Sequence, residues 1–219
     1  MDQDNIVPFA HVRTEMQYAR ISEVRAYWEA LRNGRRVPLR SEIDPRGIER
    51  ALEQAFILER IAPQVARFRL SGKALSELMG MEVRGMPFSA LFTPGGRAEL
   101  AEMIEGVFRL PQIAELDLTG ETGFGRPPLT ARLVLLPLQS DLGDISRALG
   151  CLVAEGLIGR APRRFDISAA RVTPIVEGRP TERSAPPPAL ARGFAESQIP
   201  YVPRPGRDRS HLRLVKSGE

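Results

Sequence analysis

Cysteine and histidine are scarce in this sequence of 219 residues, which contains one cysteine, Cys151, and two histidines, His11 and His211. A single cysteine excludes an intrachain disulfide and any metal site built from several cysteines. So few histidines leave no Ser-His-Asp triad and no histidine-rich metal cluster to assemble. The carboxylates form no recognisable acid–base pair. We therefore expect no catalytic residue, no metal and no enzymatic activity.

Long apolar runs are also missing, since no stretch approaches the ~18 residues that a membrane span needs. The chain begins with Asp2 and Asp4, whereas the opening of a signal peptide is basic. These features predict a cytoplasmic protein that does not enter a membrane. The positive charge is concentrated at the C-terminal end, where twelve Lys/Arg stand against six Asp/Glu from Arg160 onward. The alkaline isoelectric point therefore does not indicate a basic face on the folded part.

Two helices are predicted in residues 1–55, which we interpret as an N-terminal helical extension. Helical periodicity marks the first at residues 11–31, and Asn33-Gly34 ends it. Asp44-Pro45 begins the second, because an N-cap is followed there by proline at the first helical position. The apolar stripe of the first helix contains Ile21, Val24, Trp28 and Leu31.

Residues 56–92 alternate between strand and helix signals. Residues 56–61 and 65–70 are predicted as strands, and the alternation in the second places Arg67 and Arg69 on one face. Gly72 marks a turn, and Gly80 ends a short helix in a left-handed conformation. A longer helix is predicted at residues 97–110. Three further strands follow, at residues 113–119, 129–138 and 146–155.

This order of elements resembles the PAS domain, a small sensor module of bacterial signalling proteins. The residues that carry the resemblance are Arg67-Phe68-Arg69-Leu70-Ser71-Gly72, Leu78-Met79-Gly80, Gly85 and residues 88–92. The resemblance implies an α+β fold over residues 56–159, with a five-stranded antiparallel sheet and helices on one face. The helix at 97–110 lacks the axial histidine of haem-binding PAS domains, and Cys151 lies outside the motif of photoactive flavin-binding ones. No cofactor is therefore expected.

The segment before the first strand is similar to that of a family of short bacterial proteins with a single PAS domain. The shared features are Tyr27-Trp28, Leu31-Arg32, Gly34, Pro38, Arg40 and Ile43-Asp44-Pro45. The resemblance implies a non-catalytic regulatory protein of bacterial signalling that acts through a ligand, a partner protein or both. It identifies neither the ligand nor the partner.

Both faces of the strands at 129–138 and 146–155 are apolar, although an antiparallel sheet with one solvated face should show polar residues there. A further element must therefore cover the outer face. The stripe of Ile21, Val24, Trp28 and Leu31 is the candidate, either from the same chain or from a second subunit. We take these four residues as interface candidates and predict a homodimer formed through this helix.

A cluster of methionines and phenylalanines is expected where PAS cavities form, between the sheet and the helix at 97–110. The candidate ligand-binding residues there are Met79, Phe88, Phe92, Met103 and Phe108. Such a cluster can be an adaptable apolar pocket, and is more often ordinary core. Arg69 would bind a carboxylate ligand if its face pointed inward, and would be a solvated charge if it pointed outward.

The C-terminal part changes character after Arg160. Residues 160–172 retain strand character and are expected to add to the sheet edge. Residues 173–219 are basic and rich in proline, which predicts a disordered tail for solubility or partner docking, without nucleic-acid binding. The alternative to a PAS protein is a winged-helix DNA-binding regulator, with residues 144–165 as recognition helix and wing. Gly150 in the middle of that helix argues against it.

Overall fold

The computed structural model describes residues 9–178, and its elements follow the predicted order. The helical elements are α1 (Phe9–Arg32), η1 (Arg40–Glu42), η2 (Pro45–Ala51), α2 (Lys73–Met79), η3 (Phe88–Leu91) and α3 (Arg97–Arg109). The strands are β1 (Ala55–Ala62), β2 (Val65–Ser71), β3 (Gln112–Gly120), β4 (Leu129–Leu138), β5 (Arg147–Gly156) and β6 (Phe165–Pro174). The second predicted helix is a 3-10 helix, with the Asp44 side chain accepting a hydrogen bond from the Arg46 amide.

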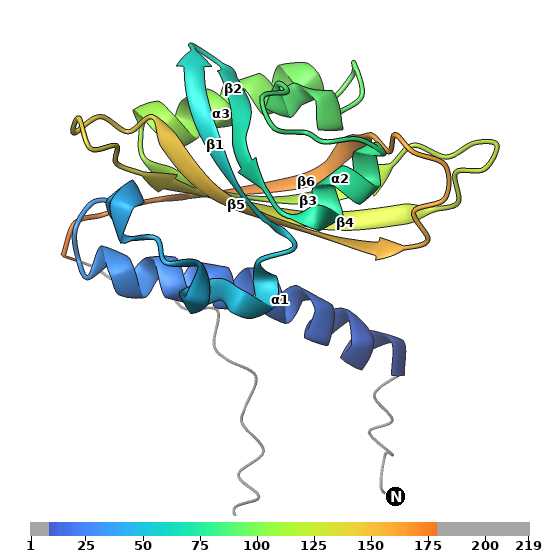
Figure 1. The fold of residues 1–219 in the computed structure, drawn as a ribbon, viewed down its shortest axis with the longest axis horizontal. Helices are drawn as coiled ribbons and strands as arrows, with labels where there is room; N and C mark the ends of the chain where they lie inside the picture. The colour runs from blue at the N-terminus through green and yellow to red at the C-terminus, as the bar shows by residue number, and fades with distance from the viewer. Residues whose placement is uncertain (1–8, 179–219) are drawn as a thin grey trace, which may run out of the picture. The chain divides into compact units, whose positions relative to one another are not determined.

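The six strands form one sheet in the order β2-β1-β5-β4-β3-β6, and every neighbouring pair is antiparallel (Figure 1). The sequence predicted five strands with an addition at the sheet edge. The sixth strand is that addition, since β6 pairs with β3 along nearly its whole length. β6 runs through Pro174 and Ile175 packs on the core, so order continues past the predicted boundary at residue 172. From residue 179 on, the predicted tail lies outside the described residues.

The inner face of the sheet, the face toward α3, carries the larger of two apolar cores. α2, η3 and α3 cover this face, and Leu100, Ile104 and Val107 of α3 are fully or almost fully buried. As predicted, Gly80 ends α2 with a positive φ of 70°, a conformation that costs glycine little. Figure 1 shows α3 on the side of the sheet opposite to α1.

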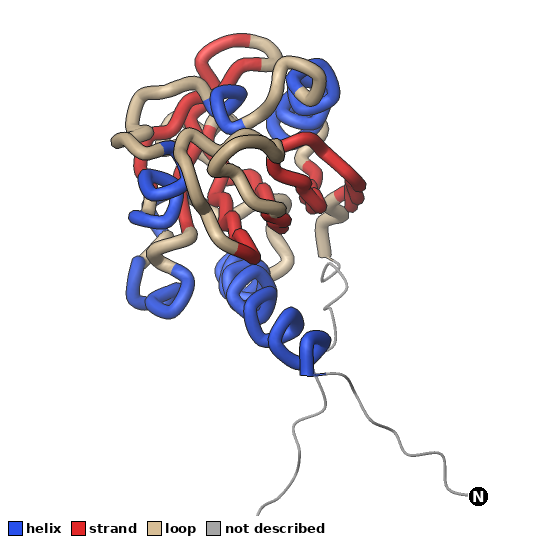
Figure 2. The backbone as a smooth tube through the Cα atoms, turned by 90° about the vertical axis from the view of Figure 1, so that its right-hand side faces the viewer, coloured by secondary structure: helices blue, strands red, loops and turns tan. Residues whose placement is uncertain are grey.

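The outer face of the sheet is covered by α1 from the same chain. Ile21, Val24 and Trp28 of α1 pack with outer-face residues such as Val134 and Leu149 in the second apolar core. The indole N–H of Trp28 donates a 2.9 Å hydrogen bond to the carbonyl of Pro137 in β4. The view in Figure 2 likewise places α1 along one side of the strands. The apolar outer face is therefore covered within one chain, and helical elements lie on both faces of the sheet.

Gly150 lies in the middle of β5 and rules out the recognition helix of the winged-helix hypothesis. Phe56 on β1 stands opposite Gly150 in the sheet. A Cβ atom at Gly150 would lie 2.2 Å from the Phe56 ring, so glycine allows the ring to pack on the strand backbone. Within residues 144–165, β5 occupies 147–156 and no helix is present. The winged-helix prediction is wrong for this reason.

Two fully buried arginines tie distant loops together. The Arg163 guanidinium donates to the carbonyls of Glu121 (3.0 Å) and Pro127 (2.8 Å) in the β3–β4 loop. It also donates to the carbonyls of Leu157 and Ile158, which follow β5. Burial lowers the pKa of this guanidinium below the usual arginine range. The Arg163 side chain thereby joins the two loops at one end of the sheet by donating only to backbone carbonyls.

Arg32 makes the corresponding connection at the end of α1. Its side chain forms an ion pair with Glu29 at 2.6 Å and lies 5.9 Å from the centre of the Trp28 ring. It also donates to the carbonyls of Arg35 (2.7 Å) and Val176 (3.2 Å). Arg32 therefore links the end of the first helix to the segment that follows the last strand.

Candidate functional site

The predicted ligand-binding residues lie together in the inner core, as the sequence suggested. Met79, Phe88, Phe92, Met103 and Phe108 are all buried, with at most 7% of each exposed. The rings of Phe56, Phe68, Phe88 and Phe92 form a continuous cluster with neighbouring centroids 5.4–5.7 Å apart. Such spacing is ordinary aromatic packing. The two best-defined hollows among residues 9–178 lie elsewhere and are lined by none of the five candidates.

Arg69 does not reach the inner core. It is exposed on β2, whereas its neighbour Phe68 is buried on the opposite side of the strand. Arg67 is paired with Glu59 at 2.8 Å, and Arg147 holds the other oxygen of that carboxylate at 2.7 Å. The hydrogen bond from Arg67 is the main cause that lowers the pKa of Glu59. Of the two orientations considered for Arg69, the structure shows the outward one, so this residue does not contribute to a site in the inner core.

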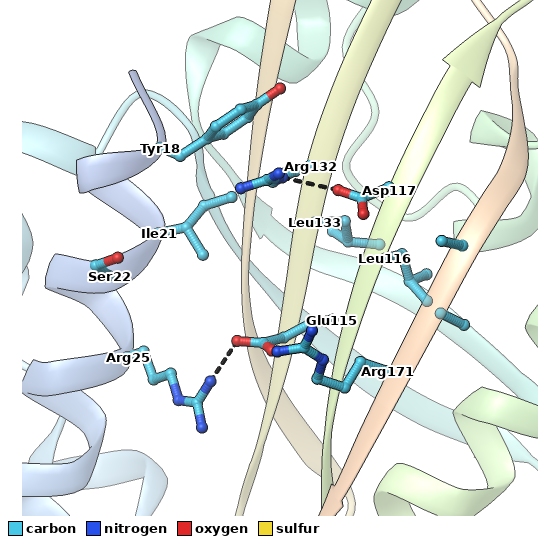
Figure 3. A pocket seen from close by; sticks show the side chains of 12 residues that line it. Tyr18, Ile21, Ser22, Arg25, Glu115, Leu116, Asp117, Arg132, Leu133 and Arg171 are labelled. Carbon is cyan, nitrogen blue, oxygen red and sulfur yellow. Dashed lines mark hydrogen bonds and ion pairs between the residues drawn. The ribbon is translucent and has the colours of Figure 1, made fainter. Parts of the chain in front are cut away.

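The larger hollow, of about 320 Å³, lies between α1 and β6 on the outer face (Figure 3). We call it the α1–β6 groove. Its walls are α1 and β6, and its floor is formed by β3 and β4. The lining residues are Tyr18, Ile21, Ser22, Arg25, Glu115, Leu116, Asp117, Arg132, Leu133, Ala169, Ala170 and Arg171. The groove exists because α1 covers the centre of the sheet and leaves the edge strand β6 open.

Charged side chains of both signs line the α1–β6 groove. Arg25 of α1 forms an ion pair with Glu115 of β3, and Arg132 of β4 pairs with Asp117 at 2.7 Å (Figure 3). The Arg132 guanidinium also lies 4.1 Å from the centre of the Tyr18 ring, a cation–π contact. Tyr18 connects α1 to the sheet in this way.

Arg171 completes the charged lining from the opposite wall. It stands on β6 directly across from Glu115 in the β3–β6 pairing and is exposed. Arginines therefore reach the groove from α1, β4 and β6, while both carboxylates come from β3. Burial is the main cause that raises the pKa of the nearby Tyr18 hydroxyl. A groove of this kind can hold polar and charged groups of a binding partner.

Sequence reasoning did not identify this groove. The alternation of residues 113–119 indicates that Glu115 and Asp117 lie on a solvated face of a strand. This pattern was the only sequence feature that pointed toward the groove. Their neighbours come from α1, β4 and β6, which are far apart in the sequence. The groove depends on β6 pairing with β3, and no local pattern gives that pairing.

The four interface candidates occupy a different position from the one expected in a dimer. Ile21, Val24 and Trp28 contact the outer face of their own sheet, and Leu31 is half-buried. Because these side chains pack against the sheet of their own chain, a dimer would have to use another surface of α1. The homodimer itself stays a prediction.

Cys151 lies on the outer face of β5 and is completely buried. Burial raises the pKa of its thiol to about 12. Because the thiolate is the reactive form, a buried thiol of this kind is inert. We expect a thiol-specific aromatic disulfide reagent at pH 8 to label the native protein only as fast as the outer core opens. Labelling as fast in buffer as in urea would contradict this.

The same thiol makes stability depend on alkaline pH. The unfolded thiol has its ordinary pKa of 9.0, whereas the pKa of the folded thiol is about 12. The contribution of the protonated thiol to the free energy of unfolding is therefore complete below pH 9. It is lost as the pH rises toward 12, by up to about 1.4 kcal/mol per pH unit. Urea titrations of the wild type and Cys151→Ala between pH 8 and 11 should show a shallower alkaline decline in the variant. Identical slopes would rule out this contribution.

Residues 9–178 contain no group of three or more His, Cys, Asp or Glu side chains arranged to hold a metal ion. None of the helices in this part of the chain is long and apolar enough to cross a membrane.

Comparison with known families places this architecture in a class. The six-stranded antiparallel sheet, with short helices and one long helix on its inner face, is a PAS-like fold. The family model of the PAS domain matches residues 16–153, which include most of α1 and most of β5. The chain belongs to the PAS domain family. A search of curated proteins gave no match.

Proposed function

We propose that this chain is a non-catalytic PAS regulatory protein that acts by binding another protein. PAS domains serve sensing and regulation, which gives the class of function. The observation that carries the choice of a protein partner is the packed inner core. The phenylalanine cluster occupies the position where a PAS ligand would be bound, and its side chains are buried and packed ring against ring.

The α1–β6 groove supports a role in protein recognition. It is open, charged with both signs and placed beside an exposed edge strand, and these properties are typical of the polar part of a protein interface. The groove arginines Arg25, Arg132 and Arg171 come from three different elements. The affinity of a partner in the groove would therefore depend on how these elements are placed relative to one another. A partner bound there would respond to how α1 lies on the sheet.

A photo-cross-linking residue at Ser22 tests this proposal in cells of the native host. Ser22 is exposed in the groove. Ala98 is an exposed control position on α3, the helix that covers the inner face of the sheet. We expect one discrete adduct from position 22 that Arg171→Glu removes, with no such adduct from position 98. An adduct of twice the chain mass would identify a second copy as the partner. Equal adducts from both positions, or none from position 22, would count against the proposal.

Native mass spectrometry of the chain purified from its own host tests the alternative of an internal ligand. We expect the mass of the folded protein, per subunit, to equal that of the bare polypeptide. A stoichiometric small molecule that leaves on denaturation would show instead that the inner core opens to bind a ligand.

A further inference from the structure

A second hollow, of about 170 Å³, lies beside η2 and is distinct from the α1–β6 groove. We call it the η2 cleft. Its walls are mostly apolar and include Ile43, Ile48, Ile57 and Leu149. Leu52 and Leu70 also line it, and each leaves 45% of its surface exposed. The cleft is therefore a small apolar depression with two exposed leucines.

Arg40 is the charged residue of this cleft, and the surrounding loop holds its backbone firmly. Its amide donates to the carbonyl of Gln139 at 2.8 Å, and the Gln139 amide donates to the carbonyl of Pro38 at 3.0 Å. Glu42 accepts from the Leu39 amide at 2.8 Å and pairs with Arg35 through both oxygens. These bonds fix Arg40 at the point where its chain segment meets the end of β4.

Tyr27 of α1 fixes the other side of the loop. Its hydroxyl accepts from the Asp44 amide at 2.8 Å and donates to the Asp44 carbonyl at 3.1 Å. Its ring packs against Gly47, where a Cβ would lie 2.1 Å from the ring. The loop that carries Arg40 and Ile43 is thus positioned by α1 on one side and by β4 on the other.

The Arg40 side chain itself has no hydrogen bond or ion pair to any residue in the described part of the chain, although it is half-buried. Most buried or half-buried arginines in the described part of the chain, such as Arg32, Arg60 and Arg163, are paired. An unpaired cation on a well-held backbone, beside an apolar depression, is complementary to an anion attached to an apolar group.

We infer that the η2 cleft binds one large apolar side chain of a partner protein, with an acidic residue beside it that pairs with Arg40. The volume fits a single side chain and is below the roughly 300–1,000 Å³ of small-molecule pockets. The exposed Leu52 and Leu70 extend the apolar contact around the anchor, as at the centre of protein interfaces. This inference rests on the proposed function and adds a second contact to it.

Selection from a random dodecapeptide library displayed on phage, with the full chain as bait, tests the inference. We expect the selected peptides to share a leucine, isoleucine or phenylalanine next to an aspartate or glutamate. Fluorescence anisotropy with a labelled selected peptide then measures affinity. Arg40→Gln and Leu70→Ser should each weaken binding by roughly tenfold or more, since both remove contacts at the anchor.

Ile61→Ser is the matched control, because Ile61 is a 52% exposed apolar residue of the same β1–β2 hairpin outside the cleft. Its affinity should equal that of the wild type. Arg40→Glu provides a test of charge, since it should prefer the same peptide with lysine in place of its acidic residue. Circular dichroism confirms that each variant remains folded.

Several results would overturn the inference. These are a library that yields no common motif, affinities insensitive to Arg40→Gln, and loss of binding in Ile61→Ser equal to that in Leu70→Ser. Hexanoate that displaces the peptide at equal concentration would assign the cleft to a free carboxylate ligand. Sedimentation that shows a dimer broken by Leu70→Ser would assign it to a second copy. The adduct at Ser22 is independent of these outcomes, so the proposed function can stand if this cleft fails.

Discussion

Replacement of Arg163 by methionine is expected to lower the free energy of unfolding by about 3–5 kcal/mol. The fully buried guanidinium satisfies four backbone carbonyls of two loops. Methionine fills a similar volume without a donor, so the part-buried carbonyls of Glu121, Pro127 and Ile158 lose their partner. Urea denaturation followed by circular dichroism measures the loss.

Arg160→Met is the matched control for this substitution. Arg160 lies in the same loop and its side chain is exposed, so its replacement should change stability by less than about 0.5 kcal/mol. Arg163→Lys keeps the charge, but an ammonium offers three donors from one point and cannot span both loops. The free energy of unfolding of Arg163→Lys should therefore lie between those of the wild type and Arg163→Met. An Arg163→Met variant as stable as the Arg160 control would contradict the role given to this residue.

Replacement of Trp28 by alanine is expected to cost about 3–5 kcal/mol and to loosen α1 from the sheet. Trp28 is completely buried in the outer core and is held by its hydrogen bond to Pro137. Its removal leaves a cavity between α1 and the outer face. Since Cys151 lies in the same core, its labelling by the aromatic disulfide reagent should become many times faster.

Trp28→Phe separates packing from the hydrogen bond. It retains most of the apolar contact and leaves the Pro137 carbonyl unpaired, at a cost of about 1–2 kcal/mol. Cys151 should then remain protected. If Trp28→Ala lowers stability without faster thiol labelling, α1 stays docked and the outer core is held by other contacts.

The elements that the sequence predicted best are those set by local signals. Alternation in residues 65–70, the left-handed Gly80 and the periodicity of α3 each depend on neighbours within a turn or a strand. The apolar pattern on both faces of β4 and β5 also led to the right consequence, because the outer face is covered by the stripe of α1. The pattern could not distinguish a helix of the same chain from one of a second subunit.

The hollows depend on pairings that no local pattern contains. Arg171 lines the α1–β6 groove because β6 pairs with β3, although β4 and β5 lie between these two strands in the sequence. Arg40 borders the η2 cleft because residues 38–40 bond to Gln139, about a hundred residues later. The inner cluster was located correctly, but whether its side chains leave space depends on how Phe56 and Phe68 join Phe88 and Phe92.

The bond from Arg32 to the Val176 carbonyl joins residues 144 positions apart in the sequence. Contacts of such separation form late, because the entropy of closing a long loop must be met first. A chain synthesised from its N-terminus completes α1 long before β4 and β5, the strands that it covers. During synthesis the apolar stripe of α1 therefore stays without its partner until nearly the whole domain has left the ribosome. The bond from Arg32 to Val176 is therefore expected to be one of the last to form.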